Sequence, residues 1–231
     1  MSGAHSLLGK GIYSVPEAAR LAGVNSRRIH RWMLGYEHGA KGGRRAATRV
    51  VRGDLPESAG QLGLSFLDLV EIRFVNHFRE TGVAWRTIRV ASERAAELLG
   101  LEHPFSTRRF RTDGKAILLE IAEESGEGDL LDLVQDQMAF GRILAPFLYK
   151  GLDFEDDVAA RWWPMDRRHS VVLDPARVFG QPIVDREEVP TATLAAACKA
   201  EGSAERAAQI YEVRVKSVLD AVEFENRLRA A

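Results

Sequence analysis

The chain has 231 residues, of which 45% are hydrophobic and 28% are charged, and its formal net charge is −1. This composition is that of a globular protein able to bury a core, and it excludes an intrinsically disordered chain. No apolar run approaches the roughly 20 residues of a membrane-spanning helix, and the first residues lack the apolar segment of a signal peptide. The single cysteine, Cys198, excludes an intrachain disulfide or CxxC metal site, so we expect a cytoplasmic protein.

The charged residues divide the chain into a basic head and an acidic body. Residues 1–52 contain 10 Lys or Arg and 2 Asp or Glu, which gives +8; the other 179 residues contain 22 and 31, which gives −9. A basic head favours contact with nucleic acid, and an acidic body favours a different partner, such as a protein. At this length we expect two or three small domains.

Residues 14–36, SVPEAARLAGVNSRRIHRWMLGY, have the pattern of a helix-turn-helix. Ser14 is a suitable N-cap for the first helix, and Gly23 can end that helix. The second helix, capped by Asn25 or Ser26, has apolar residues at i, i+3 and i+4: Ile29, Trp32 and Met33.

The opposite face of the second helix is polar and basic. It carries Ser26, Arg27, Arg28, His30 and Arg31. A guanidinium group can bind guanine edges or clamp phosphates, which are the contacts that a helix makes in the major groove. An ordinary helical hairpin with a solvated basic face would show the same residues.

A Gly-rich basic segment, residues 37–52, follows the second helix and indicates a flexible wing that tracks phosphates. Its basic residues are Lys41, Arg44, Arg45, Arg49 and Arg52. A helical hairpin followed by such a wing favours a DNA-binding unit over a solvated basic face. These five residues and the polar face of the second helix are therefore the predicted DNA contacts.

Two amphipathic helices are predicted after a loop at 54–63. Ser65 and Asp68 form a capping-box start for the first helix, which ends near Gly82, and the second helix runs from Trp85. The second helix also carries arginines that either reach flanking phosphates or form a solvated face: Arg86, Arg89 and Arg94.

This order of helix-turn-helix, basic wing and paired helices resembles the DNA-binding module of the MerR family. PEAARLAGVNSRRIHRWM carries the match, VEIRFVNHFRETGVAWRTIR lies where that family has its second helix pair, and the likeness spans about residues 12–95. The resemblance implies that the groove helix and the wing hold the DNA contacts named above. No cysteine pair follows to bind a metal effector, so we expect neither a metal site nor a cofactor.

The region at 101–170 is predicted to connect head and tail. STRRFRT and KAILLEI flank Asp113-Gly114, a dipeptide typical of tight turns, so residues 103–121 are predicted to form a β-hairpin. The acidic residues 123–129 indicate a loop, and a core helix follows that Pro146 bends or ends. The acidic residues at 153–157 fit no calcium loop and predict an exposed turn. The pair Trp162-Trp163 is predicted to anchor the connecting segment to a core.

From Val171 the pattern indicates two short strands and three helices, a small α+β domain. We expect Thr191 or Thr193 to cap the first helix and Ser203 to open the second. The third helix is expected to turn four residues inward: Val215, Val218, Leu219 and Val222. Its basic and acidic residues nearly balance, which favours a partner or dimer interface over a second DNA-reading helix.

This tail resembles a C-terminal domain of bacterial antitoxins, the domain of unknown function 433. The matching residues are Pro175, Gly180, Pro182, Ile183, Val184, Val189, Pro190, Leu194, Gly202, Ser203, Tyr211, Val213, Val218, Ala221 and Phe224. One departure is Arg186-Glu187-Glu188, where that family usually has Gly-Thr-Arg. Head and tail together resemble the larger VapB-like antitoxins, which implies a partner toxin of the PIN ribonuclease fold.

Enzymatic function is not indicated, because the six histidines form no HExxH pair and neither a Gly-x-Ser-x-Gly elbow nor a phosphate loop occurs. We expect a mainly α fold with small β elements. Its predicted parts are a winged MerR-like helix-turn-helix at 12–100, a helical and hairpin region at 101–170, and the α+β domain at 171–229. The expected function is that of a homodimeric antitoxin that binds double-stranded operator DNA, autoregulates its operon and neutralises a PIN-like toxin. The alternative is a stand-alone MerR-like regulator that dimerises or senses a small molecule through its middle and tail.

Overall fold

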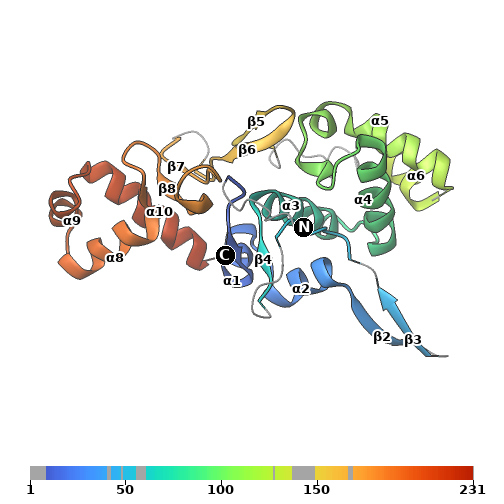
Figure 1. Cartoon of the computed structure of the whole chain (residues 1–231), viewed down its shortest axis with the longest axis horizontal. Helices are drawn as coiled ribbons and strands as arrows, with labels where there is room; N and C mark the ends of the chain where they lie inside the picture. The colour runs from blue at the N-terminus through green and yellow to red at the C-terminus, as the bar shows by residue number, and fades with distance from the viewer. Residues whose placement is uncertain are drawn as a thin grey trace, which may run out of the picture. The chain divides into compact units, whose positions relative to one another are not determined.

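The computed structural model describes residues 9–40, 43–47, 49–55, 61–126, 128–136, 149–165 and 169–230. The fold is mainly α with small antiparallel sheets, as predicted (Figure 1). Of the helices in these residues, none combines the length and the apolar content that a membrane span requires. The chain forms two compact units: a head unit of Ser14–Tyr149 with Phe154–Ala159, and a tail unit of Met1–Tyr13, Lys150–Asp153 and Ala160–Ala231.

The predicted helix pair is present as α1 (Val15–Ala22) and α2 (Ser26–Leu34), preceded by the short strand β1 (Tyr13–Ser14). Ser14 caps α1 in a capping box, because its hydroxyl accepts from the Glu17 N–H and its own N–H donates to the Glu17 carboxylate. Gly23 ends α1 with φ 65°, a left-handed conformation that glycine adopts without strain. The Asn25 side chain caps α2 by accepting from the Arg27 N–H at 2.9 Å.

The predicted wing is an antiparallel hairpin of β2 (Tyr36–Ala40) and β3 (Gly43–Ala47), which projects beyond α2 in Figure 1. Tyr36 lies opposite Ala47, so the hairpin returns the chain to α2. There the N–H groups of Val50 and Val51 both donate to the carbonyl of Trp32, at 2.7 and 3.0 Å.

A second helix pair, α3 (Phe66–Glu80) and α4 (Trp85–Leu99), follows the short strand β4 (Gly63–Leu64). The predicted capping box of Ser65 and Asp68 is confirmed. Fully buried Phe105, in the 3-10 turn η1 (Pro104–Ser106), packs its ring against three others: Phe74, Phe78 and Phe110. This aromatic cluster joins α3 to the chain that follows α4.

The β-hairpin predicted at 103–121 is wrong, because Arg108–Ser125 form one helix, α5. Thr107 caps this helix by accepting from the Phe110 N–H at 3.0 Å. Its buried residues recur at helical spacing: Phe110, Gly114, Ile117, Leu118, Ile121 and Ala122. Burial of this face overrides the turn preference of Asp113-Gly114, which lies inside the helix.

The loop predicted at 123–129 is also wrong for the residues that the structure describes. Residues 123–125 complete α5, Gly126 ends it with φ 67°, and α6 (Gly128–Gln135) begins two residues later. The start of the predicted core helix is thus helical in α6, whereas residues 137–148, with Pro146, lie outside the described residues.

The acidic stretch after residue 152 forms a hairpin of β5 (Leu152–Glu155) and β6 (Val158–Trp162). Its turn residues Asp156 and Asp157 are exposed and have φ 46° and 70°, which aspartate tolerates better than most side chains. The predicted exposed acidic turn is therefore confirmed.

The tail unit contains a three-stranded antiparallel sheet in the order β7 (Val171–Val172), β8 (Ile183–Val184) and β9 (Val189–Pro190), the last of which the sequence did not predict. Trp163 packs against Val172 and Ile183, so its anchoring role is confirmed.

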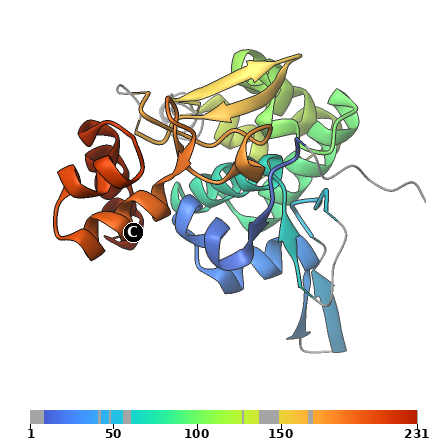
Figure 2. The same ribbon diagram turned by 60° about the vertical axis from the view of Figure 1, so that its left-hand side comes forward.

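Three helices follow the sheet: α8 (Thr191–Glu201), α9 (Ala204–Ile210) and α10 (Val215–Ala230) (Figure 2). Ser203 caps α9 as predicted. Neither threonine caps α8; the Thr191 hydroxyl instead donates to Glu225 of α10 at 2.6 Å. Leu219 was expected to face inward, but its side chain is exposed because Val218, one residue away around the helix, faces the core.

Candidate nucleic-acid interface and partner surface

Helix α2 separates its apolar and basic residues onto two faces. Ile29, Trp32 and Met33 are buried against the head unit. Ser26 is half-buried, and the four predicted basic residues are all exposed: Arg27, Arg28, His30 and Arg31. The structure therefore places all five predicted α2 residues where a ligand can reach them.

The predicted wing residues lie on the hairpin and on its return to the helices. Arg44 and Arg45 occupy β3 and pair in register with Gly39 and His38. Arg49 is exposed and Arg52 is half-buried, and Lys41 lies outside the described residues. The sequence thus supplies basic positions from α2 through the wing to the segment after it.

A pocket of about 400 Å³ adjoins the basic face of α2 and was not predicted from the sequence. It is lined by Arg28, Arg31, Trp32, Arg79, Glu80 and Trp85. Three guanidinium groups and one carboxylate make it cationic, and the Trp32 and Trp85 rings stack at 6.0 Å to form one of its walls. Helix α4 begins here without a side-chain cap, so its first N–H groups are open to a ligand, although three aspartates line another pocket at the same helix start: Asp129, Asp132 and Asp136.

Arg79 comes from the last turn of α3 and is the residue that sequence reasoning missed. Its guanidinium donates to the Val83 carbonyl at 2.6 Å, which holds it beside the turn between α3 and α4. A basic residue in the last turn of a helix that precedes Gly82 was the available signal, but that signal is also common in helices that bind nothing.

A second pocket, of about 290 Å³, brings Arg49 and Arg52 beside α4. Glu93 and Glu102 line the same pocket, so the two positive charges have two negative neighbours. Arg49 and Arg52 therefore offer phosphates a weaker field than Arg28, Arg31 and Arg79 do.

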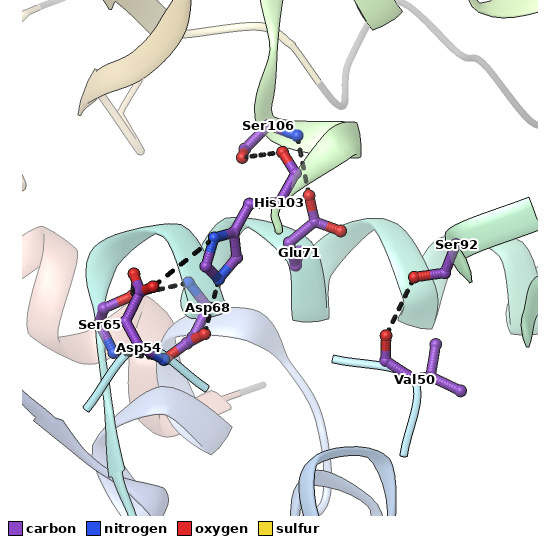
Figure 3. A network of polar contacts seen from close by, with 8 residues as sticks. All are labelled: Val50, Asp54, Ser65, Asp68, Glu71, Ser92, His103 and Ser106. Atoms are coloured by element: carbon purple, nitrogen blue, oxygen red, sulfur yellow. Dashed lines mark hydrogen bonds and ion pairs between the residues drawn. The ribbon is translucent and has the colours of Figure 1, made fainter. Parts of the chain in front are cut away.

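In the chain after the wing, Asp54 joins a largely buried polar network with Ser65, Asp68 and His103 (Figure 3). His103 Nε2 lies 2.8 Å from Asp68 Oδ1, and its Nδ1 lies 3.9 Å from Asp54 Oδ1. The Ser65 N–H and hydroxyl donate to Asp68 and Asp54 at 2.8 and 2.9 Å. Burial alone would lower the pKa of His103, but the hydrogen bond to Asp68 and the carboxylates of Glu71, Asp68 and Asp54 raise it to about 9.

Asp54, Asp68 and His103 carry ligand atoms close enough together to hold a metal ion. However, the 2.8 Å separation of Nε2 and Oδ1 is that of a hydrogen bond, so a proton already joins His103 to Asp68. The charged imidazolium balances one of the two aspartates, and a structural ion pair accounts for this geometry.

In the tail unit, a strained turn presents an exposed aromatic ring. Val178 and Phe179 in the 3-10 turn η4 (Val178–Gly180) have φ 44° and 53°, a region that β-branched residues almost never adopt. The turn is held by hydrogen bonds from the Ile12 N–H to the Phe179 carbonyl, 2.9 Å, and from the Tyr13 hydroxyl to the Gly180 carbonyl, 2.6 Å. Phe179 is nevertheless 58% exposed, beside Val178 at 38%.

Arg177 stabilises the same turn through ion pairs with three acids: Asp174, Asp185 and Glu188. A surface that maintains backbone strain and still exposes a phenyl ring has the properties of a partner contact. We name the residues Arg177–Gly180 the Phe179 turn.

The sequence and the structure of the chain were compared with those of known proteins. No protein-family model matches the chain. The chain is 30% identical to VapB45 of Mycobacterium tuberculosis, named as a candidate antitoxin, over 92% of both proteins, and 26% identical to the Rv2308 protein of the same organism over 98% of this chain and 94% of Rv2308. The crystal structure of Rv2018, also from M. tuberculosis, matches with a TM-score of 0.68 and 27% identity over 91% of this chain and 96% of Rv2018. The chain therefore belongs to the family of VapB-like antitoxins.

Proposed function

We propose that this chain is a DNA-binding antitoxin that represses its own operon through the head unit and neutralises a PIN-like ribonuclease through the tail unit. The observation that carries the DNA half is the exposed arginine face of α2 beside the cationic pocket that Arg79 completes. The antitoxin half rests on the family relationship to VapB45. A regulatory role of this kind requires no catalysis.

The proposed DNA surface combines two kinds of contact. Arg27, Arg28 and Arg31 lie on one exposed helix face, from which planar guanidinium groups can read guanine edges. Arg79, the uncapped start of α4 and the basic wing supply contacts to phosphates on either side of the groove. Base contacts give sequence preference, and phosphate contacts give affinity and orientation.

We expect the protein to bind its operator as a homodimer. One head unit presents a single groove helix, and tight specific binding at cellular salt usually requires two half-sites. A footprint on the promoter of its own gene should show an inverted repeat with half-sites about one helical turn apart, and light scattering at micromolar concentration should give twice the chain mass. A monomer that protects a single half-site would contradict this expectation.

The toxin surface is proposed to be the Phe179 turn. Residues 171–229 carry eight basic and ten acidic side chains, so this region attracts phosphates weakly and can face a basic ribonuclease. An exposed phenyl ring on a fixed turn can fill a partner's pocket with little loss of conformational entropy.

Replacing Phe179 with Ser should weaken capture of the toxin encoded by the adjacent gene by about tenfold to a hundredfold, the range of an interface anchor residue. The melting temperature should stay close to that of the wild type because the ring is exposed. Affinity is measured by calorimetry, and protection by growth of cells that express both proteins. The matched control is Leu219→Ser, which removes a similarly exposed apolar side chain from α10.

Two outcomes decide between the proposed functions. Equal toxin binding by both variants would place the toxin surface elsewhere in the chain. Absence of any toxin binding by the wild type, together with intact operator binding, would favour the stand-alone regulator.

A further inference from the structure

The segment that follows the wing, Arg49–Asp54, contacts four parts of the head unit: α2, α4, the start of α3 and His103. At its start, the Val50 and Val51 N–H groups donate to Trp32 of α2, and the Val50 carbonyl accepts from the Ser92 hydroxyl of α4 at 3.0 Å. Both valines are buried. The segment that carries Arg49 and Arg52 therefore has a fixed path rather than that of a surface loop.

At its end, the same segment is held by the polar network of Figure 3. The Asp54 N–H donates to Asp68 Oδ2 at 3.4 Å, its Oδ2 accepts from the Ser65 hydroxyl at 2.9 Å, and its Oδ1 faces His103 Nδ1 at 3.9 Å. Asp68 and His103 are buried, whereas the Asp54 side chain keeps 20% of its surface exposed. We call Asp54, Ser65, Asp68 and His103 the wing clamp.

The wing clamp uses groups that the fold already orients. Asp68 completes the capping box of α3, so its carboxylate is fixed by the helix start. His103 precedes the turn η1, where buried Phe105 anchors the chain, and reaches Asp68 from 35 residues away. Of the four clamp residues, only Asp54 belongs to the segment Arg49–Asp54 that follows the wing. Its carboxylate therefore joins this segment to the start of α3 and to His103.

We propose that the wing clamp is a positioning device for the DNA surface, in which Asp54, held by Ser65, Asp68 and His103, sets where the wing arginines lie relative to α2. The inference rests on the proposed DNA binding. The wing leaves α2 at Gly35, so its β2 end is fixed by the helix. After β3, the chain is bonded to α2 at Val50 and Val51 and to the clamp at Asp54. With both ends fixed, the wing arginines keep one register along the phosphates.

The test compares two variants that remove the same charge. Asp54→Asn removes the negative charge that faces His103 in the clamp, and Glu102→Gln neutralises a carboxylate that lines the pocket of Arg49 and Arg52 and is not one of the clamp residues. Electrostatics alone predicts tighter DNA binding for both variants, because each loses one negative charge beside the DNA surface. The clamp predicts the opposite for Asp54→Asn.

We expect Asp54→Asn to bind operator about tenfold more weakly, with the slope of log K against log salt shallower by about one to two units because one or two phosphate contacts are lost. Glu102→Gln should bind as tightly as the wild type or tighter, with an unchanged slope. Equal or tighter binding by Asp54→Asn, with the wild-type slope, would overturn the proposal.

Hydrogen exchange of the free protein keeps this test separate from DNA binding. Asp54→Asn should speed exchange at Val50 and Val51 by at least about tenfold, as expected for local opening, and leave the α10 amides unchanged. Unchanged exchange at both valines would refute the clamp even if affinity fell. A wild type that fails to bind operator would refute the proposed DNA function instead, and the exchange result would still decide whether the clamp holds the segment.

Discussion

Replacing Arg27, Arg28 and Arg31 together with Ala is expected to abolish specific operator binding. Each base-directed or phosphate contact contributes about 1 to 3 kcal/mol, so three losses reduce the affinity by at least about a hundredfold and leave only non-specific binding. All three side chains are exposed, and alanine favours helix, so α2 should remain folded. Fluorescence anisotropy with promoter DNA at several salt concentrations measures both the affinity and the salt slope.

The control for this experiment removes the same charge from the tail unit. Arg186, Arg206 and Arg229 are also exposed, and their joint replacement with Ala changes the net charge equally. If α2 enters the major groove, this control keeps its sequence preference and loses little affinity. Equal losses in the two triple variants would mean that α2 contributes only net charge.

Local signals explain why much of the head could be predicted. The capping boxes at Ser14–Glu17 and Ser65–Asp68 each involve residues three apart, and the helices that they begin lie where the sequence placed them. The exposed basic face of α2 could be predicted equally well, because helical spacing alone puts Ile29, Trp32 and Met33 on the opposite side. Short-range patterns need no knowledge of the tertiary fold.

The error at residues 103–121 shows where local signals compete. Asp113-Gly114 favours a tight turn, but Thr107 can cap a helix and Phe110, Ile117 and Ile121 can share its buried face. Packing of that face decides the outcome, and packing partners such as Phe105 are not visible in a short window. A tight hairpin turn does occur at Asp156-Asp157, where the sequence indicated only an exposed acidic turn.

The parts of the site that sequence reasoning missed depend on long-range contacts. Arg79 and Arg28 come from different helices and line one pocket only after α3 has packed in the head unit. His103 was one of six scattered histidines in the sequence, and its partner Asp68 lies 35 residues earlier. Buried polar partners at such separations follow from the fold and cannot be read from spacing.

Two buried ionisable groups, Glu71 and His103, favour a loss of stability as the pH rises. Burial raises the pKa of Glu71 from 4.5 to about 8, and the hydrogen bond to Asp68 together with the carboxylates of Glu71, Asp68 and Asp54 raises that of His103 from 6.5 to about 9. Both folded-state values exceed the unfolded ones, so the folded state binds more protons and the free energy of unfolding falls with increasing pH. The contribution of Glu71 is lost between about pH 4.5 and 8, and that of His103 between about 6.5 and 9.

Glu71→Gln isolates the larger of the two effects. A neutral amide retains an oxygen that can accept the Ser106 N–H, which lies 3.0 Å from Glu71 Oε1, and it carries no charge to bury. At about 1.4 kcal/mol for each pKa unit, the shift amounts to several kcal/mol, so this variant should be clearly more stable than the wild type at pH 8 and similar to it near pH 5. Urea unfolding at pH 5, 7 and 9 measures the difference. Glu80→Gln, an exposed position on the same helix, should follow the wild-type profile. A Glu71→Gln profile parallel to that of the wild type would mean that Glu71 is already ionised in the folded protein at neutral pH.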